Sequence, residues 1–336
     1  MRARTIRTRS RWMAKRERGA ALLSVLLLVA VMAVIAAVML ERLNLATRLA
    51  ANSQAMAQAR LYALSAENIV AARLGALVAV DRSRTVDPGG LLGSETPLPL
   101  SRGIVTVTIT DRGNCFDVNS LVVGEGERTR LNLAALDQMR RLMDALQVPM
   151  DRAVIISDSI ADWVDADQDP QVNGAEDNYY ASLPIPYRTA GRRIVDLSEL
   201  RAVRGMDEPI YRRLSPWLCA VPGGERTVIN LNTLRSDQAP LVAALMPGTL
   251  SVQQVASLIE SRPANGWSTL NQAIAPLAAM GAPIGPAQLR QLGVSSRWFE
   301  ARIVVRVDSV VLEERALIDA QLEPARIVAR SWGEAN

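Results

Sequence analysis

Apolar and polar residues follow three different patterns along this chain. Residues 19–40 form an apolar run in which Ser24 is the single polar side chain. About 20 such residues span the hydrocarbon core of a bilayer, so the run is long enough for a membrane helix. Residues 20–74 contain no Gly or Pro and consist mostly of good helix formers, which predicts one continuous helix of roughly 80 Å.

The helix beyond residue 40 has an amphipathic pattern. Apolar side chains recur near helical spacing at Leu43, Leu61, Leu64, Ile69, Ala72 and Leu77. Polar side chains lie between them, namely Arg42, Arg48, Gln54, Arg60 and Glu67. We expect this apolar face to pack against the rest of the protein.

The remaining chain begins and ends with extended patterns and is helical in between. After a predicted loop at residues 88–99, which is rich in Pro and Gly, residues 103–110 alternate and are β-branched, and residues 113–118 continue them. Helical spacing marks residues 135–146, 152–163, 197–204 and 208–218. Strand patterns return at residues 298–307, 310–320 and 325–332. This order predicts an α+β chain in which a helical insertion separates early from late strands of an antiparallel sheet.

The residues ahead of the apolar run are strongly basic. Eight Arg and Lys residues precede Gly19, against one acid, Glu17. The positive-inside bias places this end in the cytoplasm and the residues after Leu40 on the other side of the membrane. A cleaved secretory signal peptide is the alternative, but its apolar core is typically only about 7–15 residues long.

The step at Arg18-Gly19-Ala20 resembles the leader-cleavage site of type IV pilins and type II secretion pseudopilins. The resemblance implies that prepilin peptidase cuts after Gly19 and that the new amino terminus, Ala20, is methylated. An ordinary single-pass anchor is the alternative.

Most pilins carry Glu where this chain has Ser24. A carboxylate in hydrocarbon costs on the order of 3 kcal/mol, and pilins tolerate it because it can neutralise a neighbouring subunit's amino terminus. Its absence predicts a subunit with no neighbour ahead of it.

These features together resemble the general secretion pathway protein K family, the K-type minor pseudopilins of type II secretion. The resemblance implies a pilin-like fold, with a long N-terminal helix and an antiparallel sheet, that carries a large inserted α-helical domain. The expected units are a leader (1–19), a transmembrane segment (20–40), the first part of the pilin-like core (41–118), the inserted helical domain (119–222), a helix-hairpin-helix-like segment (223–294) and the C-terminal strands (295–336).

The same resemblance implies a place in a filament. We expect a subunit at the tip of a periplasmic pseudopilus that acts in protein export across the outer membrane. It would be anchored in the inner membrane with its bulk in the periplasm, and would associate with the I-type and J-type minor pseudopilins and then with the major pseudopilin. A minor type IV pilin is the alternative.

Composition narrows the functions further. The formal net charge of +4 comes from the leader, because without residues 1–19 the chain has 30 basic and 33 acidic residues, a net charge of −3. The chain has no His, which removes the commonest general base and a common zinc ligand. We find no nucleophile paired with a base, no phosphate loop and no Gly-rich nucleophile elbow. The sequence therefore predicts a protein that is not an enzyme, and a metal-assisted hydrolase or glycosidase that uses the carboxylates around Asp165 is the less favoured alternative.

Cys115 and Cys219 are the two cysteines of the chain. A domain on the outer side of the membrane meets an oxidising compartment, where such a pair can form a disulfide. The bridge would close a loop of about 104 residues and would stabilise the fold by up to ~4.7 kcal/mol in the chain-entropy picture. Two separate buried thiols are the alternative.

Residues 158–177 carry seven carboxylates, and no basic residue lies between Arg152 and Arg188. Counted from Asp165, the residues at positions 3, 5, 9 and 12 are Asp167, Asp169, Asn173 and Glu176, which is the spacing of an EF-hand loop. Pro170 stands where that loop needs Gly, so the backbone path must differ. Oxygen ligands without Cys or His select a hard ion such as Ca²⁺.

The resemblance to family K implies two structural Ca²⁺ ions in this segment. The candidate ligands are Asp162, Asp165, Asp167, Asp169, Glu176 and Asp177. A solvated acidic loop without an ion is the alternative.

Residues 228–282 resemble a helix-hairpin-helix module, a type of module that often binds DNA. Binding to phosphates needs cations near the hairpin. No basic residue lies between Arg235 and Arg262, and Asp237 and Glu260 add negative charge. We therefore expect these helices to contact protein or to serve the architecture, with a membrane-anchored DNA-binding protein as the less favoured alternative.

Overall fold

The computed structural model describes residues 9–100, 102–124, 126–221, 227–246, 248–282 and 284–333, and within these ranges it describes side chains from residue 21 onward except at residues 99 and 127. Residues 1–8 of the expected leader lie outside this description. Gly19 and Ala20 lie inside the first helix, and their side chains are outside the described set.

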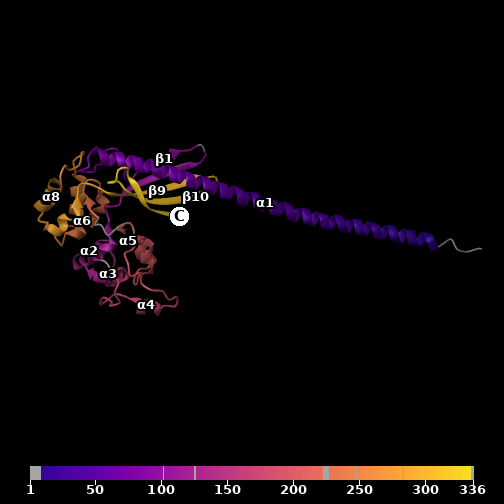
Figure 1. The fold of residues 1–336 in the computed structure, drawn as a ribbon, viewed down its shortest axis with the longest axis horizontal. Helices are drawn as coiled ribbons and strands as arrows, with labels where there is room; N and C mark the ends of the chain where they lie inside the picture. Colours follow the sequence, from indigo (N-terminus) through magenta and orange to yellow (C-terminus); the bar gives the residue numbers. More distant parts are fainter. Residues whose placement is uncertain are drawn as a thin grey trace, which may run out of the picture.

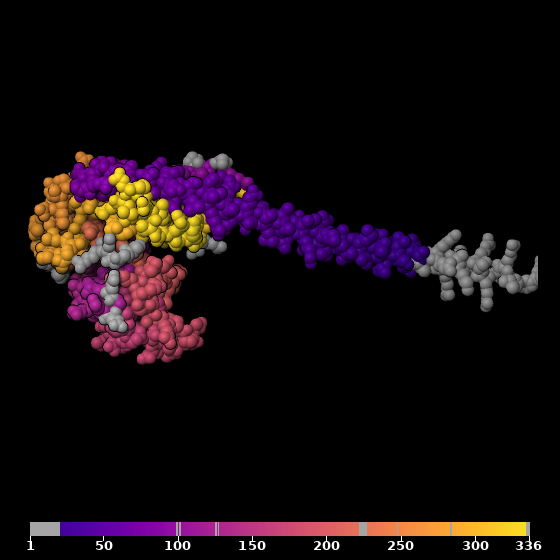
Figure 2. All heavy atoms as spheres, viewed as in Figure 1, coloured from indigo at the N-terminus to yellow at the C-terminus, as the bar shows by residue number. Residues whose placement is uncertain are grey.

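The first helix dominates the shape of the molecule (Figure 1). Helix α1 (Arg9–Val80) runs without a break for 72 residues, which corresponds to roughly 110 Å. Its N-terminal half projects from the folded body as a bare rod (Figure 2). Within the described chain it is the one helix long and apolar enough to cross a membrane, and its most apolar stretch is fully exposed. The expected continuous helix is thus present.

The face of α1 that packs on the body differs from the expected one. Leu43 and Leu61 are 65% and 64% exposed, and Ile69 is 45% exposed. The buried stripe consists of smaller residues at three- and four-residue spacing, namely Ala55, Ala59, Ala63, Ala66, Val70, Leu74 and Val78. The prediction was wrong because alanines let the helix axis approach the sheet closely, whereas the larger leucines have no room there.

A single antiparallel sheet lies under the C-terminal half of α1 (Figure 1). Its strand order is β1-β2-β9-β10-β11, so early and late strands of the chain are neighbours. The strands are β1 (Glu95–Pro99), β2 (Ile104–Asp111), β9 (Trp298–Val307), β10 (Val310–Asp319) and β11 (Arg326–Gly333). Alternating residues of β2, β9 and β10 face α1 and form one hydrophobic core with it.

The early extended segments differ in two places from the sequence-based expectation. Strand β1 occupies residues expected to be loop, because an edge strand tolerates prolines such as Pro97 that would break a central strand. Residues 113–118 yield only the short strand β3 (Phe116–Asp117), since Gly113 donates its backbone N–H to the Asp111 carboxylate and turns the chain.

An ion triad of one exposed arginine and two buried acids also ties α1 to the sheet. Arg330 on β11 donates to Glu67 on α1 at 2.5 and 2.7 Å and to Glu314 on β10 at 3.0 Å. Both carboxyl groups are buried, and Oε2 of Glu314 has no hydrogen-bond partner within the described structure. Burial and the neighbouring Glu67 carboxylate raise the pKa of Glu314 to about 8. Burial alone would raise the pKa of Glu67, but hydrogen bonds from Arg330 and Glu314 lower it.

The helical region inserted between β2 and β9 forms a second body with a core of its own. Its α-helices are α2 (Leu133–Ala145), α3 (Met150–Val164), α4 (Asp177–Ala181), α5 (Glu208–Leu214), α6 (Ala239–Leu245), α7 (Val252–Glu260), α8 (Leu270–Ala279) and α9 (Pro286–Leu289). The 3-10 helices are η1 (Val118–Leu121), η2 (Gly126–Arg128), η3 (Leu197–Ala202) and η5 (Ser236–Gln238), and the short strands are β4 (Val122–Val123), β5 (Arg130–Leu131), β6 (Leu218–Cys219), β7 (Ile229–Asn230) and β8 (Leu292–Gly293). Residues on both sides of position 222 contribute to the same core.

Several helix expectations need adjustment. Residues 197–204 form the 3-10 helix η3 rather than an α-helix, because the capping residues Asp196 and Glu199 close a short turn that ends at Ala202. The helix expected over residues 208–218 ends at Leu214, and Leu218 already belongs to β6, which pairs with β3 in parallel.

The disulfide lies where the two bodies meet. Cys115 and Cys219 are bonded, with their Cα atoms 5.9 Å apart. Beside them, Asp111 at the end of β2 accepts hydrogen bonds from Thr233 at 2.5 Å and from Ser296. A covalent bridge and a buried polar network therefore fix the helical body to the sheet, and α4 lies at its far end (Figure 1).

Candidate cation site

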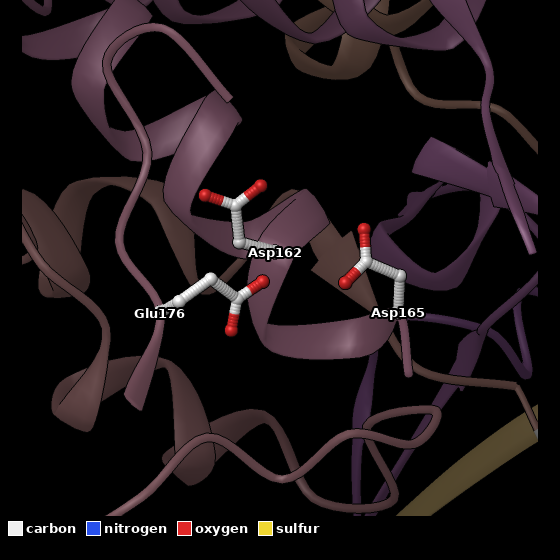
Figure 3. A group of neighbouring side chains, drawn as sticks. All are labelled: Asp162, Asp165 and Glu176. Carbon is white, nitrogen blue, oxygen red and sulfur yellow. The ribbon is translucent and has the colours of Figure 1, made fainter. Parts of the chain in front are cut away.

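Three carboxylates converge at the far end of the helical body (Figure 3). Asp162 lies in the last turn of α3, Asp165 caps the C-terminus of that helix, and Glu176 precedes α4. Each offers an oxygen within 4.8 Å of the others. Residues three and four apart share a helix face, which brings Asp162 near Asp165, and the loop 166–175 returns Glu176 to them.

The three carboxylates are buried and incompletely satisfied. Asp162, Asp165 and Glu176 are 0%, 7% and 3% exposed. Oδ1 of Asp165 and both oxygens of Glu176 have no hydrogen-bond partner among the described residues, where none of the three acids forms an ion pair either. Buried charge without a partner is strongly unfavourable, so this geometry fits a bound cation.

The electrostatics of the site show the same deficit of positive charge. Burial and the neighbouring carboxylates raise the pKa of Asp162 to about 6, that of Asp165 to about 7 and that of Glu176 to about 8. The C-terminus of α3 adds the negative end of a helix dipole. The neighbouring carboxylates and the helix dipole both make it unfavourable to ionise all three acids unless a cation is bound.

The loop is held in place by Asp158, which lies outside the cluster, and by Asp162, which belongs to it. Asp158, one turn before Asp162, accepts from Arg140 at 2.5 Å and from the Asn173 backbone and side chain at 3.3 and 3.1 Å. Asp162 accepts from the backbone N–H of Gln171 at 3.1 Å. A side chain at Gly174 would collide with Asp162, so only glycine permits this close approach.

An aromatic cluster supports the site from the protein side. Trp163 meets Tyr180 edge-on with ring centroids 5.4 Å apart, and Tyr187 packs on Tyr180 at 5.1 Å. Arg204 donates to the Gly174 carbonyl at 2.8 Å. Within the described structure it forms no ion pair with the three clustered acids. The buried rings of Trp163 and Tyr180 therefore pack beside the segment that carries Asp162 and Asp165.

The other sequence-predicted ligands lie around this cluster. Asp167 is exposed, accepts from the Asp169 backbone at 3.0 Å, and is near enough to raise the pKa values of the buried acids. Asp169 is exposed as well. Asp177 points to Thr189, whose N–H and hydroxyl donate at 2.9 and 3.0 Å. The ligand roles of these three residues remain predictions.

Sequence spacing and tertiary placement diverge at two residues. Asn173, at EF-hand position 9, donates to Asp158 instead of pointing to the cluster. Asp158 was not among the predicted ligands. Its four-residue spacing from Asp162 places both side chains on one face of a helix, and this spacing was the sequence signal that could have linked Asp158 to the site.

The segment with the helix-hairpin-helix pattern uses its two basic residues internally. Arg262 donates to the Leu231 and Leu234 carbonyls at 2.9 and 2.8 Å, and Arg235 pairs with Asp237 at 3.0 Å. Neither guanidinium is presented as a free cation to a nucleic acid. The helices α6, α7 and α8 instead bury their apolar faces in the shared core.

A long apolar helix that packs its second half on an antiparallel sheet, with a helical body inserted in the sheet, defines a membrane-anchored pilin-like protein with an accessory domain. Two family models described as type II secretion system protein K match residues 114–223 and 229–295. The chain belongs to the type II secretion system protein K family and is a minor pseudopilin of that system.

Relatives support this assignment over nearly the full length. The chain is 36% identical over 329 residues to type II secretion system protein K of Pectobacterium carotovorum subsp. carotovorum, covering 96% of this chain and 98% of the relative. It is 33% identical over 321 residues to that of Klebsiella pneumoniae, covering 95% and 97%.

A solved structure has the same fold. The GspK–GspI–GspJ complex of the type 2 secretion system from enterotoxigenic Escherichia coli contains a chain that matches with a TM-score of 0.72 and 29% identity, covering 84% of this chain and 99% of that one. The expected fold class and the expected family are thereby confirmed.

Proposed function

We propose that this protein forms the tip of the type II secretion pseudopilus together with the I-type and J-type minor pseudopilins. The observation that carries the proposal is the likeness to a chain whose structure was solved in complex with two such proteins. The major pseudopilin would then extend the filament below this tip. The protein would act through assembly, without an enzymatic step.

The shape of the molecule supports a terminal position. The bare half of α1 offers apolar side chains on every side, suited first to lipid and then to neighbouring helices in a filament (Figure 2). The helical body extends to one side of the sheet and makes the head much broader than the rod (Figure 1). A subunit of this width would obstruct another subunit stacked above it.

Membrane placement and processing complete the proposal. The basic residues before Gly19 would hold the amino terminus in the cytoplasm, with the bulk in the periplasm and α1 in the inner membrane. Prepilin peptidase would cut after Gly19 and leave a methylated Ala20. Amino-terminal sequencing of the mature protein should begin at Ala20 with a methylated amine, and a start beyond Leu40 would refute retention of the helix.

The tip assignment has a direct test. Affinity purification of the tagged full-length chain from membranes should recover the I-type and J-type proteins of its own secretion system. Deleting the gene should leave secreted proteins in the periplasm. Recovery of type IV pilus components in their place would support the minor-pilin alternative. Ser24→Glu should assemble poorly, and normal secretion with that variant would remove the argument from the missing carboxylate.

We further propose that the cation site holds Ca²⁺ with a structural role. Asp162, Asp165 and Glu176 fit a hard cation, because their oxygens converge, are buried and lack protein donors. Asp167, Asp169 and Asp177 would complete one or two ion sites if the exposed loop closes on the metal. Because the folded site would bind the ion and the unfolded chain would not, binding free energy would add to folding free energy.

A further inference from the structure

A cavity apart from the cation site lies between the first turns of α2 and helix α9. Its volume is about 400 Å³, within the range of small-molecule sites. Its walls come from two parts of the helical body that are far apart in sequence. Lining residues within 115–138, together with residue 193, come from the first part, and lining residues within 227–229 and 287–291 come from the second. No residue of the acidic segment 158–177 is among the described lining residues.

The side chain of Gln138 opens onto this cavity. Ala134, Ala135 and Gln138 line it from one face of α2, as their three- and four-residue spacing requires. Gln138 is 5% exposed as a residue, and its amide atoms are not among the fully buried atoms of the described structure that lack a partner. The amide therefore faces the open space of the cavity, where a ligand could reach it.

The described lining residues include two arginines and one acid. Arg290 is exposed and makes no ion pair or side-chain hydrogen bond within the described chain. Arg193 is held by the Asn119 and Gly124 carbonyls at 3.4 and 3.3 Å and pairs with no described carboxylate. Asp117 is the acid among the described lining residues. Its carboxylate accepts from the Asn119 backbone at 3.1 Å, and burial raises its pKa to about 7.

We propose that this cavity binds an organic carboxylate of about dipeptide size. The carboxylate would be held by the guanidinium groups of Arg193 and Arg290, which are planar donors suited to that group. The rest of the ligand would extend past the apolar side chains of Val122 and Ile229 to the Gln138 amide. The ligand is either the carboxyl-terminal end of a peptide or a free small carboxylate, since both present the same chemistry.

Calorimetric titration of the full-length protein in detergent tests the proposal. The probes are acetyl-Ala-Ala with a free carboxylate, the same peptide as its terminal amide, and succinate. We expect saturable binding of at least one carboxylate and at least tenfold weaker binding of the amide. Binding of the peptide alone would identify a peptide end, and binding of succinate alone a free small carboxylate. Absence of binding by both, or equal binding of the amide, would overturn the proposal.

Two substitutions localise the binding. Arg290→Gln should weaken it at least tenfold, which is about 1.4 kcal/mol. Arg326→Gln, which changes an exposed arginine on β11, is the matched control and should leave it unchanged. Equal effects of both variants would mean that binding reflects general charge and would overturn the assignment to this cavity.

The Gln138 amide gives a test that needs no ligand. Gln138→Met keeps the volume and removes the polar group, so without ligand its melting temperature should equal or exceed that of the wild type. The same variant should lose affinity for the probe. A fall in melting temperature would show that the amide has a structural partner and would overturn its assignment to a ligand. None of these outcomes depends on assembly or on Ca²⁺, so they are independent of the proposed function.

Discussion

Replacing Glu176 by Gln should change the stability of the protein in opposite directions with and without Ca²⁺. Glu176 is 3% exposed, and both its carboxylate oxygens lack partners within the described structure. The carboxylate oxygens of this cluster lie within 4.8 Å of one another, and two unit charges at that limit repel by roughly 3 kcal/mol at an effective dielectric constant of about 20. Proton uptake relieves much of this repulsion, so we expect a gain of about 1 kcal/mol for the metal-free variant.

Bound Ca²⁺ should raise the free energy of unfolding of the wild type by more than the loss of the Glu176 charge raises that of the metal-free variant. A ligand at 100 times its Kd stabilises the folded state by about 2.7 kcal/mol. Each kcal/mol corresponds to about 2–4 °C in a domain of 150–250 residues. The wild type should thus melt roughly 5–10 °C higher with saturating Ca²⁺. Glu176→Gln should melt a few degrees above the wild type in chelator and show little response to Ca²⁺.

Thermal melts of the full-length protein in detergent, in chelator and across a Ca²⁺ series, provide the assay. Glu260→Gln is the matched control, because Glu260 ends α7 on the surface and lies outside the cluster. It should behave as the wild type does in both conditions. An equal Ca²⁺ response in the wild type and Glu176→Gln would refute the assignment of Glu176 as a ligand, and no response in the wild type would refute the site.

Three further results are expected. Ala63→Leu should destabilise the fold by about 1–3 kcal/mol in denaturant unfolding, because Ala63 is fully buried between α1 and the sheet. Gly174→Ala should abolish the Ca²⁺-dependent shift in melting temperature, because the added methyl group displaces Asp162. Stability should fall between pH 4.5 and about 8, because the raised pKa values of Glu314 and, in the metal-free protein, of Glu176 make the fold hold these protons longer than the unfolded chain does. Glu314→Gln has no proton to lose at this position, so its fall should be smaller, and it should be more stable than the wild type at pH 9 and similar to it at pH 5.

Each of these results has its own control. Ala72→Leu adds the same volume on the exposed face of α1 and should leave stability within about 0.5 kcal/mol. A comparable loss in both helix variants would contradict the buried Ala stripe. For the pH series, Glu300→Gln changes a partly exposed acid on β9 and should keep the wild-type slope of stability against pH. An unchanged slope in Glu314→Gln would show that another group is responsible for the pH dependence. A normal Ca²⁺ shift in Gly174→Ala would mean that the loop tolerates a side chain there.

Local sequence determined most of the secondary structure of the pilin-like part. The uninterrupted helix formers of α1 and the alternating residues of β2, β9, β10 and β11 specify those elements, because helix propensity and strand alternation act between near neighbours along the chain. The single pair of cysteines likewise left one possible intramolecular bridge, and the structure contains it. The leader, the membrane helix and the missing glutamate were also enough to indicate the family.

Tertiary structure decided which of several similar residues are used. The amphipathic pattern of α1 favoured its leucines, but close approach to the sheet buries the Ala stripe instead. The sequence proposed six carboxylates of this segment as ligands, and only the fold of the loop onto α3 separates the buried group of Asp162, Asp165 and Glu176 from the exposed Asp167 and Asp169. Burial depends on contacts between residues far apart along the chain, and no local pattern encodes which neighbours those will be.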